Sequence, residues 1–228
     1  MQVQKNCTKY WSRNKFPDSH RVDRQLALIF ESQGDLKNAV EGYEALVEED
    51  PLDLISRKRQ INIILNNICM SSENGTNGGE TGNERAISTL VDHLSQFQAD
   101  HESWMVLANL YCNEWKLSNA AYCLEEVILH MPDNRHIICR YAEIQYSGNP
   151  DQQRIRSARQ YFIYANRLCP KWIRPLFGIL VCCSRLRRTE TQSDNISVFA
   201  WAKLQLKSLC QPCKLSVCVD KFIKSIEY

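Results

Sequence analysis

The sequence predicts an all-α protein, a right-handed α-solenoid in which paired helices stack one after another. Three observations predict it: apolar residues recur at helical spacing, small residues stand where helices must cross, and prolines punctuate the pattern. The spacing is clearest in mid-chain, where Trp104, Leu107, Ala108 and Tyr111 fall at i, i+3, i+4 and i+7. These four side chains share one stripe of a helix, so they predict an amphipathic helix packed against a neighbour.

The pattern predicts a second helix that packs against the first. Ala120 and Leu124 lie on its apolar stripe, and Ala120, like Ala108, is small because two backbones approach closely there. Pro132 cannot continue a helix and pushes Met131 out of the helical region, so it ends the pair. This order of residues is the spacing of one tetratricopeptide repeat, a helical hairpin of about 34 residues. Because a lone hairpin leaves apolar faces open, the repeat must recur.

The repeat does recur toward the N-terminus. Pro17 and Pro51 are 34 residues apart, whereas Pro51 and Pro132 are 81 apart, 13 more than two repeats. The segment from Ser71 to Asn83 is polar and rich in glycine and asparagine, so we expect it to be a disordered loop that holds the surplus. The expected positions between the first two prolines are filled by Leu26, Ala27, Phe30, Gly34, Ala39, Tyr43 and Leu46.

Toward the C-terminus the pattern continues with one short insertion. The interval from Pro132 to Pro170 exceeds one repeat by four residues, which we place in the turn from Ser147 to Gln153. A fifth unit opens near Trp172 and continues to a helix at about residues 196–209.

The last segment has a different character. Residues 213 to 226 are apolar on one side and rich in lysine on the other, which suits a helix that caps the stack. We therefore expect three parts: a partial N-terminal repeat in residues 1–18, a tetratricopeptide-repeat domain in 19–209 and a C-terminal capping helix in 210–228.

Composition limits the classes of partner. The chain has 28 basic and 26 acidic residues, a net charge of about +2, which implies neither nucleic acid nor an anionic membrane as a direct partner. The longest apolar run, Leu176 to Cys183, is far shorter than the roughly 20 residues of a membrane helix. Lys5, Lys9 and Arg13 interrupt any secretory signal at the start. We expect a cytosolic protein.

Motifs for catalysis, metals and cofactors are sparse, so we expect a non-catalytic protein with none of them. The five histidines show no metal-ligand spacing, and no nucleophile is paired with a base in a local motif. Cys210 and Cys213 form a C-x-x-C pair, but zinc requires four ligands and only Cys218 follows nearby. A zinc or thiol enzyme using Cys210 and Cys213 is one hypothesis; structural or incidental cysteines are the other.

Two sets of residues are candidates for partner binding. Arg57, Lys58 and Arg59 form a basic cluster, which indicates either a solvated helix face or a site for an acidic segment or lipid headgroups. Asn109 and Arg140 fall at groove positions where chaperone-binding repeat proteins hold a C-terminal carboxylate. Only fragments of that clamp are present, at Arg24 with Leu28, Met105 with Asn109, and His136 with Arg140.

Seven short strings carry a more specific resemblance than the repeat pattern, because several of them lie outside the repeat positions. The strings are Phe16-Pro17-Asp18-Ser19-His20-Arg21-Val22, Glu49-Asp50-Pro51, Arg57-Lys58-Arg59, Ala120-Ala121-Tyr122-Cys123-Leu124-Glu125-Glu126, Tyr141-Ala142-Glu143, Leu176-Phe177-Gly178 and Trp201-Ala202. Through them the chain, from about residue 16 to 209, resembles the family of ER membrane protein complex subunit 2. Family members carry further helices before the first of these strings and a shorter turn in place of the loop from Ser71 to Asn83.

The resemblance implies a function for the scaffold. It implies a subunit on the cytoplasmic face of the ER membrane, peripheral through its partners, that organises an insertase for tail-anchored and multi-pass proteins. The implied partners are cytosolic segments of membrane-spanning subunits and a soluble cytosolic subunit, and insertion itself belongs to the membrane-spanning partners. The alternative function is a cytosolic peptide-binding co-chaperone adaptor, which would bind an acidic C-terminal peptide through Arg140.

Overall fold

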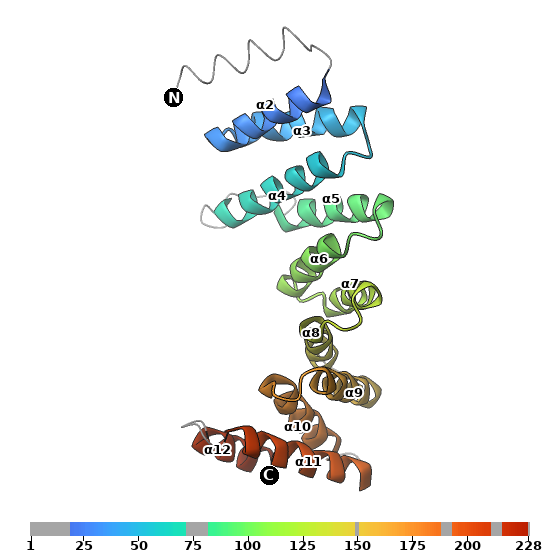
Figure 1. Cartoon of the computed structure of the whole chain (residues 1–228), viewed down its shortest axis with the longest axis vertical. Helices are drawn as coiled ribbons and strands as arrows, with labels where there is room; N and C mark the ends of the chain where they lie inside the picture. The colour runs from blue at the N-terminus through green and yellow to red at the C-terminus, as the bar shows by residue number, and fades with distance from the viewer. Residues whose placement is uncertain (1–18, 72–81, 149–150, 188–192, 211–215, 228) are drawn as a thin grey trace. The chain divides into compact units, whose positions relative to one another are not determined.

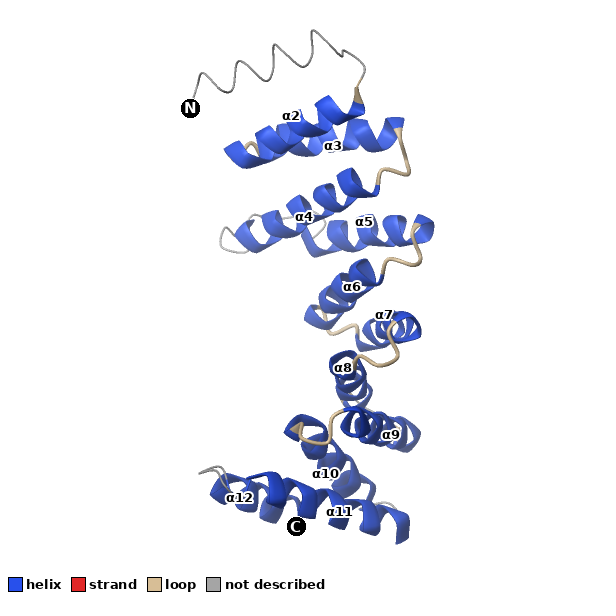
Figure 2. Ribbon diagram, in the orientation of Figure 1, coloured by secondary structure: helices blue, strands red, loops and turns tan. Residues whose placement is uncertain are grey.

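The computed structural model describes residues 19–71, 82–148, 151–187, 193–210 and 216–227. Every regular element in these ranges is a helix (Figure 2), so the predicted all-α class with helical hairpins is confirmed. The chain divides into two compact units, one ending at Phe97 and the other beginning at Gln98. The expected partial repeat in residues 1–18 lies outside the described residues.

The first unit consists of two helical hairpins (Figure 1). Helix α2 packs on α3, α3 on α4, and α4 on α5, the order in which they follow along the chain. A backbone turn at Gly34, with φ of 78°, ends α2, and the amide of the next residue donates to Phe30 O. Glycine adopts this left-handed conformation without the steric cost of a Cβ atom. The helices are α2 (His20–Gln33), α3 (Leu36–Glu49), α4 (Leu54–Ser71) and α5 (Gly82–Gln96).

Small residues lie where α2 and α3 cross. A Cβ atom on Gly42 of α3 would lie 3.3 Å from Cβ of Ala27 on α2, which is closer than ordinary van der Waals contact, so the two helices approach this closely because residue 42 is a glycine. Around this crossing lie the buried side chains of Ala39, Tyr43 and Leu46. The apolar stripes of α2 and α3 thus face each other.

The second unit continues with three hairpins and a terminal helix. Each hairpin joins a first helix to a second, and α12 packs on α10 and α11. The helices are α6 (His101–Asn113), α7 (Leu117–His130), α8 (Arg135–Tyr146), α9 (Gln152–Leu168), α10 (Ile173–Arg187), α11 (Ser193–Cys210) and α12 (Ser216–Glu227).

The hairpin of α6 and α7 contains the residues that set the sequence frame. Leu107, Ala108, Ala120 and Leu124 are buried between the helices. The rings of Trp104 and Tyr111 are half-buried. The Trp104 indole N–H donates to the Gln98 carbonyl oxygen at 2.8 Å, and the indole meets the ring of Tyr122 edge-on.

Pro132 follows the end of α7, as the sequence predicted. Met131 ends α7 with non-helical backbone angles, φ −133° and ψ 71°, and Pro132 follows in the turn before α8. Helix α8 ends at Tyr146 and α9 begins at Gln152, so Gln152 and Gln153 of the turn predicted for Ser147 to Gln153 are helical, and residues 149 and 150 lie outside the described ranges.

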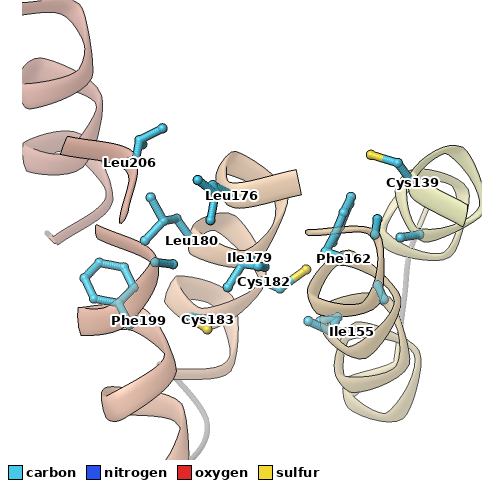
Figure 3. Close-up of a cluster of buried hydrophobic side chains, with 14 of the residues drawn as sticks. Cys139, Ile155, Phe162, Leu176, Ile179, Leu180, Cys182, Cys183, Phe199 and Leu206 are labelled. Carbon is cyan, nitrogen blue, oxygen red and sulfur yellow. The ribbon is translucent and has the colours of Figure 1, made fainter. Parts of the chain in front are cut away.

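The core of the second unit centres on α10. Figure 3 shows α10 between α9 and α11, with Leu180 and Cys183 on the side of Phe199 and with Ile179 and Cys182 on the side of α9. This cluster is continuous from α8 to α12. Burial of such a continuous apolar layer is what holds successive hairpins together.

Several predicted boundaries shift. Ser71 belongs to α4 and Gly82 to α5, so helices extend into both ends of the expected loop, whose residues 72–81 lie outside the described ranges. Helix α12 is described from Ser216 to Glu227, and residues 213–215 of the expected capping helix lie outside the described ranges. Within the described ranges, no helix combines the length and apolar character required to span a bilayer.

Candidate partner-binding site

The groove candidates of the second unit lie on successive first helices. Asn109 is half-buried on α6, and its Oδ1 is buried without a hydrogen-bond partner among the described residues. Arg140 is half-buried on α8, and no carboxylate of the described chain forms an ion pair with its guanidinium. An amide and an unpaired guanidinium are the groups that bind backbone and carboxylate groups of a peptide.

The neighbouring charge on α8 is satisfied internally. Arg174 of α10 binds Glu143 of α8 in a two-pronged ion pair, with Nε to Oε1 at 2.6 Å and Nη2 to Oε2 at 2.7 Å. The hydrogen bonds that Arg174 donates to the Glu143 carboxylate raise the pKa of Arg174 above its ordinary value. Because Glu143 is neutralised by Arg174, it does not compete for Arg140.

Aromatic contacts fix the edge of this surface. The ring of His136 on α8 lies 4.8 Å from that of Trp172 and meets it edge-on. The guanidinium of Arg135 lies 5.9 Å from the centre of the same indole, which favours a cation–π contact. His136, a groove candidate from the sequence, is therefore tied to the start of the next hairpin.

The three residues of the basic cluster on α4 point in different directions and interact with different groups. Arg57 donates from Nη2 to the Pro51 carbonyl oxygen at 3.4 Å and lies over the ring of Phe97. Arg59 pairs with Glu31 of α2 at 3.3 Å. Lys58 also interacts within the protein. Since consecutive helical residues point about 100° apart, these three cations do not form one basic patch.

A further clamp candidate, Arg24, is also engaged. Its Nη2 lies 2.6 Å from Oδ2 of the buried Asp53, which additionally accepts a hydrogen bond from the Ser56 hydroxyl. Burial tends to raise the pKa of Asp53, but the hydrogen bonds from Ser56 and Arg24 outweigh it, so the pKa falls below its ordinary value. Arg24 thus links α2 to the start of α4 and is not free to hold a peptide carboxylate.

Sequence reasoning missed the ion pairs that join successive hairpins. Glu143 with Arg174, Arg24 with Asp53 and Glu31 with Arg59 are 28 to 31 residues apart, a little less than one repeat. Opposite charges at that separation are a signal that the sequence alone could have supplied.

The hypothesis of a zinc or thiol site at Cys210 and Cys213 receives no support from the described residues. Cys210 is buried, and Cys213 lies outside the described residues. No group of three metal-ligating side chains gathers in the described part of the chain.

Comparison with known proteins decides the family. A sequence model of the EMC2 TPR-like repeat domain matches residues 12–151, more than half of the chain. The chain belongs to this family. The match covers the first unit and the hairpins of the second as far as the start of α9, so the candidate residues Arg57, Asn109 and Arg140 all lie on the EMC2-type repeat domain.

Curated relatives agree. The chain is 32% identical to ER membrane protein complex subunit 2-A of Xenopus laevis over 204 residues, which cover 87% of this chain and 64% of that protein. It is 28% identical to the corresponding subunit of Dictyostelium discoideum over 213 residues, covering 86% of this chain and 61% of that one. The chain therefore spans somewhat less than two thirds of the length of these EMC2 relatives.

Solved structures support the fold alone. YrrB, described as a TPR protein with an unusual peptide-binding site, matches with a TM-score of 0.61 at 10% identity, covering 92% of this chain and 96% of that one. The C-terminal part of a TPR repeat-containing protein from Cytophaga hutchinsonii also matches with a TM-score of 0.61, at 14% identity and with 95% and 79% covered. The EMC2-family chain thus has a TPR-like helical fold.

Proposed function

We propose that this chain is a non-catalytic scaffold subunit of the ER membrane protein complex, peripheral on the cytoplasmic face of the ER membrane. In this role it holds cytosolic segments of membrane-spanning subunits and a soluble cytosolic subunit at fixed positions, and so organises an insertase for tail-anchored and multi-pass proteins. Its membership of the EMC2 family carries the proposal. The repeat domain supplies the means, because stacked hairpins keep bound segments in a set geometry.

The first-helix surface of the second unit is the proposed contact. Arg140 offers a guanidinium without an internal partner in the described chain, and Asn109 offers a buried amide oxygen that lacks a donor there. Leaving the buried Asn109 oxygen unsatisfied costs free energy, which a bound segment would recover. Arg24, by contrast, is occupied by Asp53, so a co-chaperone clamp of the usual composition is less well supported.

Site-specific crosslinking in membranes tests this proposal. A photoreactive amino acid at position 140 should crosslink to an ER membrane protein when the full-length protein is expressed in cells and microsomes are irradiated. The same amino acid at position 119, an exposed site on α7, serves as the matched control. Crosslinks at 140 only to soluble chaperones would favour the adaptor alternative, and equal crosslinking at both positions would contradict a specific first-helix site.

A further inference from the structure

A pocket opens between two successive second helices of the second unit, away from the groove candidates. Its volume is about 440 Å³, within the usual range for ligand sites. Helix α9 supplies one wall and α11 the other. The lining residues are Ile163, Asn166 and Arg167 of α9 with Ser197, Val198 and Trp201 of α11.

The walls of this pocket are fixed by the packing beneath it. Arg159 of α9 donates from Nη1 to Asn195 Oδ1 of α11 at 2.9 Å, and the Asn195 amide donates to the Cys183 carbonyl oxygen of α10 at 3.0 Å. Phe199 and Ala202 of α11 are buried in the core against α10. The pocket is therefore formed before any partner arrives, which lowers the entropic cost of binding.

One polar group in the pocket lacks a partner. Asn166 is only 5% exposed, and its Oδ1 is buried with no hydrogen-bond donor in the described part of the chain. Buried side-chain oxygens in folded proteins are nearly always bonded, so the Asn166 oxygen is open to a hydrogen-bond donor from an occupant of the pocket. An occupant with an N–H or O–H group fits this requirement.

Apolar surface continues beyond the pocket. Trp201 is 40% exposed, and Leu204, three residues further on the same helix and hence on the same side, is 69% exposed. The surface is wider than the pocket itself. A polypeptide, which can place one side chain in the pocket and lay others on Trp201 and Leu204, fits it better than a small molecule does.

The α9 side of the pocket has charge of one sign. Helix α9 contains four arginines and no aspartate or glutamate. Arg167 lines the pocket, is exposed, and forms no ion pair with any described residue. The single acidic residue of α11, Asp194, lies in its first turn, at the end near Asn195 and away from Trp201. The complementary occupant is acidic.

We propose that the groove between α9 and α11 is a docking site for an acidic amphipathic segment of a partner protein. The segment places a large apolar side chain between Ile163 and Trp201, a hydrogen-bond donor on Asn166 and a carboxylate on Arg167. This site lies on second helices and is separate from the first-helix surface of the proposed function. Its existence does not depend on that function, and its test uses the isolated full chain.

A peptide-display library of random 14-residue segments, selected on the full-length protein, tests the proposal without a named ligand. Selection is repeated on Ser197→Trp, which fills the pocket, and sequences found with both proteins are removed. We expect the remaining peptides to carry an aromatic or leucine residue with aspartate or glutamate within four positions. The selected peptide is then synthesised with a fluorescent label, and its Kd is measured by fluorescence polarisation.

Matched variants locate the binding. Arg167→Glu should raise the Kd of the labelled peptide at least tenfold. Arg154→Glu should leave the Kd unchanged, because Arg154 is exposed on the same helix but lies outside the pocket. Trp201→Ala should also raise the Kd, whereas Trp115→Ala, at an exposed tryptophan on the α6–α7 turn, should not. Circular dichroism verifies that each variant is folded, and Arg167→Glu, a surface change, provides the test if Trp201→Ala does not fold.

Three results would overturn the proposal. One is the absence of peptides that distinguish the wild type from Ser197→Trp. Another is the selection of basic peptides, or of peptides that bind the Arg167→Glu variant as tightly as they bind the wild-type protein. The third is a concentration-dependent dimer, detected by light scattering and dissolved by Trp201→Ala, because the occupant would then be a second copy of the chain.

Discussion

A Cβ atom placed on Gly178 of α10 would lie 2.6 Å from the ring of Phe162 on α9. Real Cβ atoms essentially never approach another atom so closely, and the Phe162 ring is buried in the central cluster, so it has little room to move. Glycine is required at position 178 because the Phe162 ring lies directly against the α10 backbone.

We predict that Gly178→Ala destabilises the second unit by about 1–3 kcal/mol, because the added methyl overpacks the contact with Phe162. Urea unfolding followed by circular dichroism measures the change. Phe162→Leu in the same chain should recover part of it, giving a coupling energy in a double-mutant cycle. Additive effects of the two substitutions would contradict the contact.

Gly34 tests a different property of glycine. Its φ is 78°, and nothing lies within 4 Å of the position that a Cβ atom would take, so Gly34→Ala should cost about 1–2 kcal/mol through backbone strain alone. Gly34→Asn should cost less, since asparagine tolerates the left-handed conformation better. Equal losses for alanine and asparagine in thermal unfolding would indicate that the turn is not held at positive φ.

Burial differs sharply along α7. Leu124 is fully buried, whereas Leu129 on the same helix is 75% exposed. Leu124→Ala should destabilise by about 2–5 kcal/mol, because it removes core contacts and leaves a cavity. Leu129→Ala should change stability by less than about 0.5 kcal/mol. A comparable loss at both positions, measured by denaturant unfolding, would mean that the helix is rotated about its axis relative to this structure.

The pair of Arg24 and Asp53 predicts a pH dependence in the first unit. Hydrogen bonds from Ser56 and Arg24 lower the pKa of Asp53 below its ordinary value of 3.8. The folded state therefore binds a proton less readily than the unfolded state. This contribution to stability is fully present above about pH 4 and is lost as the pH falls through the lowered pKa.

Hydrogen exchange of α4 amides at pH 7 and at pH 3 measures this loss. Asp53→Asn should reduce the difference in opening free energy between the two pH values. Asp92→Asn, at an exposed carboxylate of α5, is the control and should leave the difference unchanged. A pH response that is the same in Asp53→Asn and in the wild type would exclude the pair as its source.

Cysteine reactivity should follow burial. Burial raises the pKa of the Cys182 thiol to about 12, so very little thiolate is present at pH 8. Cys218, by contrast, is exposed on α12. Iodoacetamide should therefore modify Cys218 of the folded protein much faster than Cys182, as peptide mass spectrometry can follow. Rapid modification of Cys182 would show that the core around α10 opens readily.

The hairpins could be predicted because their signals are local. Trp104, Ala108 and Ala120 lie at fixed spacings within one repeat, and Pro132 ends that repeat by its own covalent geometry. The pairing of Arg24 with Asp53 could not be read from such spacing, because it depends on how α2 lies relative to the start of α4. For this reason Arg24 was assigned to a groove, although its charge is used within the first unit.

The pocket between α9 and α11 was missed for a related reason. Trp201 and Arg167 are in different repeats, and each alone is compatible with an ordinary surface helix. Their shared cavity and the unpartnered Asn166 become visible only when both helices are placed. The predicted loop boundary was inexact because the helical ends at Ser71 and Gly82 are formed by residues that are typical of loops.

A scaffold role for this EMC2-family chain within a membrane complex is tested most directly by purifying the tagged full-length protein from cells in a mild detergent. Quantitative mass spectrometry then gives the amount of each co-purifying protein relative to the tagged chain. We predict that integral ER membrane proteins are recovered in amounts close to that of the chain itself. Recovery of the chain only as a free monomer would contradict the scaffold role.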